Sequence, residues 1–562
     1  MDIISQIKNT LYSYIESNYS FDINSLSHLD TSLNVDVSKQ QFGDITTNVA
    51  LLISKQLKRD PKSIAQDIKN NFKNKHIDHI DIAGPGFINI FLTLDTIKEL
   101  AHDMFIKDQD FFKSKSIHEN YLETELDFSL EFVSANPTGP LHIGHGRGGI
   151  IGDVLSNILK FLSNKVTKEF YINDAGNQIE KLGQSFKIRC LQQVGVQIEL
   201  PDDAYHGEYL IDLAKKCVKE YNLKTQEDIE SKDLAFFSIY AKDFLLNKIE
   251  KTLEQYGINY DVWFSEKTLH HDNSIELSIE KLEKQNYIYK KDEALWFKST
   301  AFGDDKDRVV KKSSGEYTYV AADIAYLENK IARGASKIIM ILGQDHHSYV
   351  NRLKGLMEAL GYNPDDLTVI LYQLVTIKQS GETLRLSKRA GRIVTLEDVI
   401  NLVGSDVARF FYLNKKADAH LDFDLDLALK QTDENPVYYV QYAYVRTISI
   451  LNKAQEELKT CNENAISFDD YKFLSESERF LIKKIAYLKD LLESISTNYQ
   501  VHLLTYYVLE LAQLFHSYYG SNKVINKDNI EQTRGRLFFI MLLKRTLNTC
   551  FKLLGISAPE HM

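Results

Sequence analysis

The chain has 562 residues, of which 44% are hydrophobic and 26% are charged, and its formal net charge is −11. This length predicts about three or four domains, and the composition excludes a disordered or fibrous protein. The acidic balance argues against indiscriminate binding to nucleic acids, so any nucleic-acid partner is expected at a defined surface.

The sequence predicts a soluble, cytoplasmic protein with no membrane partner and no bound structural metal. Its first residues alternate polar and apolar positions without a continuous apolar core, which argues against a signal peptide. No apolar run approaches the ~20 residues of a membrane-spanning helix. The cysteines show no C-x-x-C spacing, which argues against a zinc site and a disulfide framework and fits a reducing compartment. They are Cys190, Cys217, Cys461 and Cys550.

Three zones follow one another along the chain. Residues 1–115 are expected to form an α+β module, with helices over 1–18 and 61–73 and an extended run after a Gly-Pro-Gly turn. Residues 116–430 alternate strand-like and helix-like segments, which indicates a parallel α/β sheet. Residues 431–562 repeat apolar positions at three- and four-residue spacing, which predicts an all-α bundle.

A strand, a turn and a helix occur together in the second zone. Apolar and polar residues alternate over 126–132, which predicts a strand with two different faces. The Asn-Pro-Thr-Gly-Pro turn at 136–140 ends it. The buried face of the following helix is expected to consist of Ile151, Val154, Leu155, Ile158 and Leu162.

The start of that helix is a candidate anion site, because free N–H groups and the positive end of the helix dipole face a ligand there. His142 and His145 are three residues apart in the opening turn, so both imidazoles are expected on one side. Gly144 leaves space in which a flat base could pack. An isolated histidine pair at such a place is more often a metal site or buried, but the complete His-Ile-Gly-His string after a strand and a proline turn resembles the first signature of class I aminoacyl-tRNA synthetases.

A second signature of that class is expected downstream on a basic loop. Residues 385–389 read Arg-Leu-Ser-Lys-Arg, whereas the class pattern is Lys-Met-Ser-Lys-Ser, so three of five positions differ. Ser387 and Lys388 are retained, and Lys388 matches the lysine that is catalytic in the class. Alone, a charged loop is usually just solvated; its order and distance after the histidine string support the assignment.

The resemblance implies ATP chemistry at these residues. An amino-acid carboxylate attacks the α-phosphorus of ATP, and the departing pyrophosphate gains negative charge, so cations and N–H donors are needed in advance. His142, His145 and Lys388 are the expected suppliers, and Mg²⁺ would neutralise the leaving group. The ATP-binding residues implied are Pro140, Gly144, Gly343, Asp345 and Ser387. Asp345 follows the apolar run 338–342 and is a candidate for the ribose hydroxyls, or alternatively a helix cap.

Several strings narrow the class to one family. They resemble arginyl-tRNA synthetases in the family's order and over essentially the whole chain: 42–50, 84–90, 131–148, 171–179, 260–266, 317–326, 343–353, 434–446 and the APEHM terminus. The resemblance implies a Rossmann-type catalytic domain with an insertion over about 180–262. It also implies a mostly monomeric enzyme that forms arginyl-adenylate from L-arginine and ATP and transfers arginine to tRNA(Arg). Arginine activation in the family needs bound tRNA.

The chemistry of arginine agrees with this resemblance. A planar guanidinium is best held by carboxylates and an aromatic ring or hydroxyl. Tyr319 and Asp323 are four residues apart in an expected helix and so share a face. By resemblance these two residues and Glu266 grip the guanidinium, although individual roles could be permuted. The amino and carboxylate groups would be held by Glu131, Asn136 and Gln344.

Two surfaces are expected to bind tRNA by resemblance. Phe87 and Asn89 match positions that stack on and hydrogen-bond an exposed base at the tRNA corner; the alternative is that Phe87 belongs to the core. Tyr438, Tyr442 and Arg446 form a candidate stacking surface for anticodon bases in the helical domain. Some tyrosines of that segment must instead pack the bundle.

Two rival interpretations remain at this point. A glutamyl-type enzyme also tolerates a Leu-Ser-Lys-Arg loop, but it would lack the amino-terminal module and the Tyr319/Asp323 pair. A catalytically inactive paralogue that serves as an RNA-binding or regulatory protein should have lost one of His142, His145 and Lys388, and all three are present.

Overall fold

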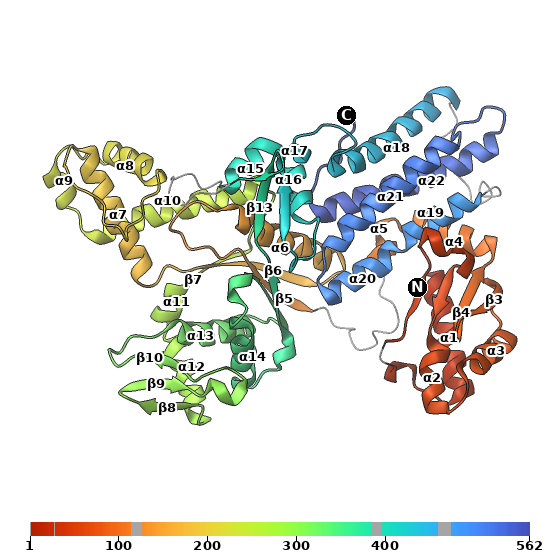
Figure 1. Cartoon of the computed structure of the whole chain (residues 1–562), viewed down its shortest axis with the longest axis horizontal. Coiled ribbons are helices and arrows are strands. Elements are labelled where there is room, and N and C mark those ends of the chain that lie inside the picture. Colours follow the sequence, from red (N-terminus) through yellow and green to blue (C-terminus); the bar gives the residue numbers. More distant parts are fainter. Residues whose placement is uncertain (1, 27, 114–125, 385–394, 459–473) are drawn as a thin grey trace. The chain divides into compact units, whose positions relative to one another are not determined.

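The computed structural model describes residues 2–26, 28–113, 126–384, 395–458 and 474–562 (Figure 1). These residues form two compact units. The first comprises the described residues of Met1–Thr124, Phe161–Ser163 and Gln431–Met562. The second comprises those of Glu125–Lys160 and Asn164–Lys430. None of the described helices combines the length and apolarity that a membrane crossing requires.

The amino-terminal part of the first unit is an antiparallel sheet with helices, as expected for an α+β module. Its strands, in the order β1-β2-β4-β3, are β1 (Thr31–Leu33), β2 (Ile45–Thr47), β4 (Phe87–Leu92) and β3 (Ile77–Ala83). Its helices are α1 (Ile3–Tyr19), α2 (Val49–Leu57), α3 (Pro61–Asn71), α4 (Leu94–Lys107) and α5 (Gln109–Lys113), with 3-10 turns at Ile23–Ser25 and Val37–Phe42. The two helices expected from periodicity are confirmed as α1 and α3.

Local sequence explains where these elements begin and turn. Asp60 accepts a hydrogen bond from the Ser63 backbone N–H at 2.9 Å, and Pro61 occupies the first turn of α3, where its missing N–H costs nothing. The turn between β3 and β4 places Gly84 at φ 54° and Gly86 at φ 139°. Such angles favour glycine, which explains the Gly-Pro-Gly signal.

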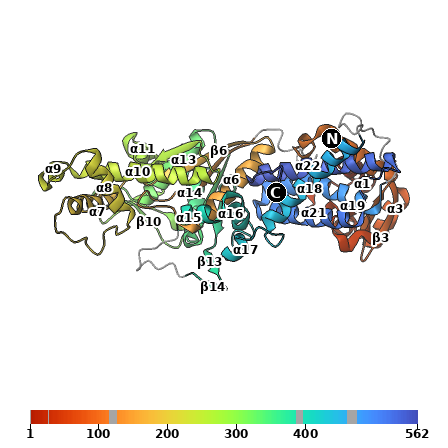
Figure 2. The same ribbon diagram turned by 90° about the horizontal axis from the view of Figure 1, so that it is seen from above.

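The carboxyl-terminal part of the first unit is the predicted helical bundle. Its helices are α18 (Pro436–Leu458), α19 (Glu476–Ala486), α20 (Leu488–Asn498), α21 (His502–Ser521) and α22 (Ile530–Leu554). Ser475 and Glu478 form a reciprocal capping box at the start of α19. Helices α18, α21 and α22 run side by side in both views (Figures 1 and 2).

Buried ion pairs and aromatic contacts join the module to the bundle within this unit. Lys489 of α20 donates to Asp2 at the start of α1, and both side chains are buried. Lys483 of α19 lies 2.6 Å from Asp44. The Phe105 ring of α4 lies 4.6 Å from the Phe538 ring of α22. The sequence pattern suggested two separate flanking domains and carried no signal for this junction.

A five-stranded parallel sheet lies at the centre of the second unit, as the α/β pattern predicted. Its order is β12 (Leu367–Tyr372), β11 (Lys337–Gly343), β5 (Asp127–Phe132), β6 (Lys165–Ile172) and β7 (Val262–Ser265), and every neighbouring pair is parallel. Three of its helices matter for the site: α6 (Ile143–Phe161), α13 (Tyr319–Ala332) and α14 (Tyr349–Ala359). The apolar residues predicted for the buried face of α6 are buried. Ligand sites in such sheets gather at the carboxyl ends of the strands.

The segment from about 180 to 262, predicted as an insertion, forms helices that lie together in Figure 1. They share an apolar core of their own. These helices are α7 (Asn177–Gln193), α8 (Tyr209–Glu220), α9 (Gln226–Glu230) and α10 (Leu234–Gln255). Cys190 and Cys217 are buried in this core as free thiols. These two cysteines therefore act as small apolar residues.

Further elements complete the second unit. An antiparallel sheet consists of β10 (Arg308–Lys311), β9 (Ala294–Phe297) and β8 (Ile288–Lys291), and a mixed sheet consists of β14 (Glu382–Thr383), β13 (Val375–Gln379) and β15 (Leu421–Asp424). The remaining helices are α11 (Glu266–His271), α12 (Ser274–Lys284), α15 (Leu396–Val403), α16 (Ser405–Tyr412) and α17 (Leu425–Ala428). Three 3-10 turns occur at Ser299–Phe302, Gln344–His346 and Pro364–Asp366.

Candidate active site

The two histidines of the first signature stack on each other at the start of α6. Their ring centroids are 3.6 Å apart with an angle of 26° between the planes. The Nδ1 of His145 accepts a hydrogen bond from the His142 backbone N–H at 3.2 Å, and the Nδ1 of His142 accepts one from the Gly144 backbone N–H at 3.1 Å. The neutral His145 imidazole therefore carries its proton on Nε2.

His145 contributes a hydrogen-bond donor and not a positive charge. Burial, and secondly the neighbouring His142, lower the pKa of His145 to about 3. The sequence predicts that His145 supplies a cation or an N–H donor to the phosphates, and its lowered pKa favours the donor role. A Cβ on Gly144 would lie 3.0 Å from the His142 ring. The glycine therefore makes room for the histidine stack, besides any room that it leaves for a base.

The second signature lies outside the described residues, and Ser387 and Lys388 with it. The described residues that follow it return to the histidine pair. Thr395 forms an isolated antiparallel bridge with His142. The Leu396 backbone N–H donates to the Leu141 carbonyl at 2.8 Å. The described chain therefore resumes, after the second signature, directly beside the first one.

A strained turn follows β5 at the carboxyl edge of the sheet. Val133 and Ser134 both have positive φ, at 69° and 41°, which is unusual for a β-branched residue. The Ser134 hydroxyl donates to Glu131 at 3.1 Å and accepts from the Tyr171 backbone N–H at 3.1 Å. This turn leaves Glu131 buried and presents Asn136 to solvent. Nothing in the alternating pattern of β5 signalled the turn.

Residues after β11 lie at the same edge of the sheet. Gly343 is its last residue, and Gln344 and Asp345 begin the 3-10 turn that follows. Gln344 is half-buried and Asp345 is exposed. The N-cap of α14 is Ser348, so Asp345 does not cap that helix. The assignment of Asp345 to the ATP ribose stays a prediction.

The buried carboxyl of Glu266 accepts hydrogen bonds from two neutral side chains. The Tyr171 hydroxyl bonds to it, and the Asn173 amide, in the orientation that satisfies its neighbours, donates to it at 3.0 Å. Burial, and also the nearby Asp174, raise the pKa of Glu266 to about 7, although the Tyr171 hydrogen bond opposes this shift. Apart from the His270 imidazole, whose Nε2 lies 3.9 Å away, no positively ionisable side chain of the described residues forms an ion pair with this carboxyl. Such a group gains most from a ligand that brings a positive charge.

Asp323 has a similar environment one helix away. The Tyr349 hydroxyl donates to its carboxylate. Burial, and the neighbouring carboxyls of Glu266 and Glu131, raise the pKa of Asp323 to about 7, against the opposing effects of Tyr349 and Arg352. Glu266 and Asp323, two neighbouring carboxyls that resist ionisation, thus form an acidic cluster that favours a bound cation.

Tyr319 and Asp323 both lie on α13, as the spacing predicted. Tyr319 is the first residue of the helix and is 61% exposed, so its ring is open to solvent. The acidic cluster of Glu266 and Asp323 also includes their hydrogen-bond partners Tyr171, Asn173 and Tyr349. Sequence reasoning missed these three partners. The strings at 171–179 and 343–353 contain them, but no spacing rule connects them to Glu266 or Asp323.

Comparison with known proteins agrees with this geometry. The model described as "tRNA synthetases class I (R), catalytic domain" matches residues 112–418, and "Arginyl tRNA synthetase N terminal domain" matches 3–92. "DALR anticodon binding domain" matches 440–562. The arginine–tRNA ligase of Anoxybacillus flavithermus is 40% identical over 100% of both chains, and that of Bacillus subtilis is 40% identical over 92% of both chains.

The chain belongs to the arginyl-tRNA synthetase family. Solved structures agree with this assignment at the level of the fold. The Thermus thermophilus arginyl-tRNA synthetase superposes with a TM-score of 0.74 at 19% identity, and the Plasmodium falciparum one with a TM-score of 0.75 at 20% identity; each comparison covers 100% of both chains. The family match excludes the glutamyl-type alternative.

The residues expected at the tRNA corner differ in exposure. Phe87 at the start of β4 is 40% exposed, which argues against a core role. Asn89, two residues on, is only 3% exposed, and it is paired with Thr46 and Asp81 in the sheet. A hydrogen bond from Asn89 to a base would therefore require its side chain to become accessible.

Two of the residues expected at the anticodon surface, Tyr442 and Arg446, belong to an aromatic cluster on α18 and α21, in which Tyr442 is exposed and Arg446 half-buried. The guanidinium of Arg446 lies 5.0 Å from the ring centroids of both Tyr442 and Tyr519. The His516 ring stacks on Tyr442 at 5.6 Å. Tyr438 lies on α18 and is half-buried. Tyr519 and His516 were not predicted, because helix spacing within α18 gives no information on the facing helix.

Proposed function

We propose that the chain, an arginine–tRNA ligase, forms arginyl-adenylate at the carboxyl edge of its parallel sheet and then transfers arginine to the 3′ end of tRNA(Arg). Pyrophosphate leaves in the first step and AMP in the second. The observation that carries this proposal is the combination of a stacked histidine pair at the start of α6 with two neighbouring carboxyls of raised pKa, Glu266 and Asp323. The first fits a polyphosphate and the second fits a guanidinium.

ATP binding is assigned to the start of α6 and the end of β11. His142 and His145 donate their Nε2–H groups to phosphate oxygens, while Pro140 and Gly144 shape the turn that admits the nucleotide. Gly343 and Asp345 face the ribose, and Ser387 and Lys388 hold the pyrophosphate. ATP arrives with Mg²⁺ as part of the substrate. The proposal is supported by the return of the chain beside His142 at Thr395.

L-Arginine binding is assigned to the acidic cluster of Glu266 and Asp323. Glu266 and Asp323 pair with the guanidinium, and Tyr319 covers it from the open side of α13. Glu131, Asn136 and Gln344 hold the amino and carboxylate groups, so that the carboxylate faces the α-phosphorus. A carboxylate oxygen attacks phosphorus, the bond to the pyrophosphate breaks, and the N–H donors and Lys388 stabilise the negative charge that develops.

Binding of tRNA(Arg) is assigned to the first unit. Phe87 and Asn89 read the tRNA corner, and Tyr438, Tyr442 and Arg446 stack on anticodon bases, together with His516 and Tyr519. The exposed Tyr442 ring and the half-buried Tyr519 ring beside the Arg446 guanidinium support this assignment, because stacking and cation–π contacts are the usual means of binding splayed bases. We further propose that the enzyme acts as a monomer in the cytoplasm.

The test is aminoacylation of tRNA(Arg) with labelled arginine. The wild type is expected to charge the RNA with arginine and not with lysine or glutamate. Lys388→Ala should lose about 10²–10³-fold in kcat, as expected for removing one preorganised group. Lys378→Ala is the matched control, since Lys378 forms only a half-exposed ion pair with Asp422. Charging with lysine or glutamate as efficient as with arginine would refute the proposal.

A second measurement addresses the order of events. Pyrophosphate–ATP exchange with arginine is expected to stay near background until tRNA(Arg) is added, as in the family. Robust exchange without RNA would contradict that expectation. If neither wild type nor variant charges RNA while RNA binding persists, the inactive binding protein is the correct interpretation.

A further inference from the structure

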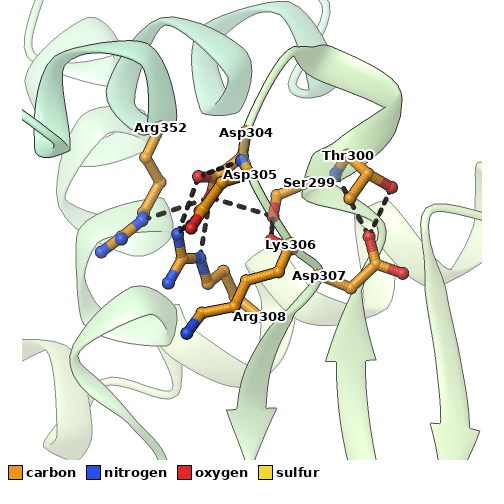
Figure 3. Close-up of polar contacts among 8 residues, drawn as sticks. All are labelled: Ser299, Thr300, Asp304, Asp305, Lys306, Asp307, Arg308 and Arg352. Carbon is orange, nitrogen blue, oxygen red and sulfur yellow. Dashed lines mark hydrogen bonds and ion pairs between the residues drawn. The ribbon is translucent and has the colours of Figure 1, made fainter.

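The Asp304 side chain is largely buried and accepts hydrogen bonds from two arginine side chains, those of Arg308 and Arg352. Asp304 follows the turn Ser299–Phe302 and accepts two hydrogen bonds from Arg308, each of 2.8 Å. It also accepts one from the Ser299 hydroxyl at 3.1 Å and one from the Nε of Arg352 at 3.4 Å. Figure 3 shows both guanidinium groups converging on this one carboxylate.

Arg352 connects the Asp304 carboxylate to the acidic cluster of Glu266 and Asp323. It lies on α14, three residues after Tyr349, and its guanidinium carbon is 4.9 Å from the centroid of the Tyr349 ring. The Tyr349 hydroxyl in turn donates to Asp323. A continuous series of contacts therefore runs from Asp304 through Arg352 and Tyr349 to the carboxylate that we assign to the substrate guanidinium.

We propose that Asp304 and Arg352 are positioning residues for arginine selection, in which Asp304 fixes Arg352 and Arg352 holds the Tyr349 ring so that its hydroxyl points at Asp323. This inference rests on the proposed role of Asp323. A planar guanidinium needs a carboxylate of fixed orientation for paired hydrogen bonds. One hydrogen bond from Tyr349 fixes that orientation and leaves the other lone pairs of Asp323 free for the substrate.

If Asp304 and Arg352 only stabilised the loop that carries Asp304, less of their geometry would be explained. Arg308 already satisfies Asp304 with two hydrogen bonds, so stability of the loop does not require Arg352. Arg352 places a permanent charge against an aromatic face, where it is held by both cation–π attraction and the Asp304 carboxylate. Its charge also opposes the rise in the pKa of Asp323.

The charged and titratable groups around Asp323 come from four elements. Tyr349 and Arg352 belong to α14, Glu266 begins α11, and Glu131 lies in β5. The Tyr171 hydroxyl, from β6, is also affected by the charge of Asp323. Arg352 is the cation among these groups. Its removal should therefore shift the protonation of Asp323 toward higher pH.

The experiment measures arginine KM, ATP KM and kcat for aminoacylation at saturating tRNA(Arg), from about pH 6 to about pH 8. Tyr349→Phe, Arg352→Gln and Asp304→Asn are expected to raise arginine KM about tenfold, as for one lost hydrogen bond to a charged group, with ATP KM unchanged. In Arg352→Gln, the rise of arginine KM on acidification should begin at higher pH than in the wild type. Arg352→Lys should restore the wild-type pH profile because it restores the charge.

Asp305→Asn is the matched control. Asp305 is a neighbouring, exposed carboxylate that pairs with Arg308, and no contact joins it to Arg352 in the structure. It should leave arginine KM unchanged. The inference would be overturned if Arg352→Gln raised the KM values for arginine and ATP equally and left the pH profile unchanged. The two variants Arg352→Gln and Arg352→Lys decide this even if Asp304→Asn does not fold. An unchanged arginine KM in Asp323→Asn would instead overturn the proposed function on which the inference rests.

Discussion

Lys330 forms a fully buried ion pair with Glu131, its Nζ lying 3.2 Å from the carboxylate. The same ammonium lies 2.7 Å from Glu169 and donates to the Ser129 hydroxyl at 3.1 Å. Burial alone would raise the pKa of Glu169, but Lys330 and Arg333 lower it to about 2. Lys330 thus joins Ser129 and Glu131 of β5 to Glu169 of β6 at a buried polar face, and Glu131 belongs to the proposed arginine site.

Replacing Lys330 with methionine should destabilise the fold strongly. The variant Lys330→Met leaves two buried carboxyls without their shared cation, and breaking a buried pair from one side costs about 3–5 kcal/mol. Thermal unfolding monitored by circular dichroism would measure this. Lys281→Met is the control, because Lys281 and Glu328 form a partly exposed pair, for which about 0–1 kcal/mol is expected. A loss in Lys330→Met no larger than in the control would contradict the cluster's role.

Arginine binding should weaken as the pH falls below about 7. The pKa values of Glu266 and Asp323 are both raised to about 7 from ordinary values of 4.5 and 3.8. A raised carboxyl pKa means that the free folded protein prefers the protonated form, so these groups favour folding at low pH and lose that contribution as the pH rises to about 7. The guanidinium requires the ionised form, so binding must release protons below that pH.

Isothermal titration calorimetry in buffers of different ionisation enthalpy counts these protons. Below about pH 7, arginine should release up to two protons per molecule bound, and Glu266→Gln or Asp323→Asn should each remove one of them. Binding that releases no protons and keeps its affinity across this range would show that the two carboxyls do not hold the guanidinium.

The junction within the first unit should depend on Asp2. Burial alone would raise the pKa of Asp2 above its ordinary value of 3.8, but Lys489 and Ser5 lower it to about 2. A lowered carboxyl pKa stabilises the folded state by about 2 kcal/mol above about pH 4, and this contribution disappears as the pH falls through about 2. Asp2→Asn should cost more at neutral pH, about 3–5 kcal/mol, because it leaves Lys489 buried without its partner.

Thermal unfolding at neutral pH checks this, with Asp81→Asn as the control. Asp81 forms an exposed pair with Lys69 in the same module. The control should unfold within a few degrees of the wild type. If Asp2→Asn did the same, the buried pair would not be what joins the module to the bundle.

Sequence reasoning succeeded where the signal is local and failed where it depends on tertiary partners. The helix after the histidine string and the helix that carries both Tyr319 and Asp323 follow from helical spacing, and both helices are confirmed. The alternation over β5 indicated a strand with a polar face, but that face is buried, because Lys330 from a distant helix neutralises it. Tyr349 and Arg352 could not be assigned, since their partners Asp323 and Asp304 are separated from them by many residues.

The aromatic cluster on α18 should bind RNA in proportion to its stacking. Tyr442→Ala is expected to raise the KM for tRNA(Arg) by about 10–100-fold, since each base stacked on a ring contributes about 1–3 kcal/mol, with arginine KM unchanged once tRNA is saturating. Arg446→Ala should act similarly and reduce the salt dependence of binding.

Tyr506→Ala is the matched control for this surface, because Tyr506 on α21 is 42% exposed, as is Tyr442, and its ring contacts His502 and not Arg446. Equal exposure with a different neighbourhood separates a specific stacking platform from general surface hydrophobicity. A rise in tRNA KM of the same size in Tyr506→Ala would assign the effect to the bundle as a whole, and an unchanged KM in Tyr442→Ala would remove α18 from the anticodon surface.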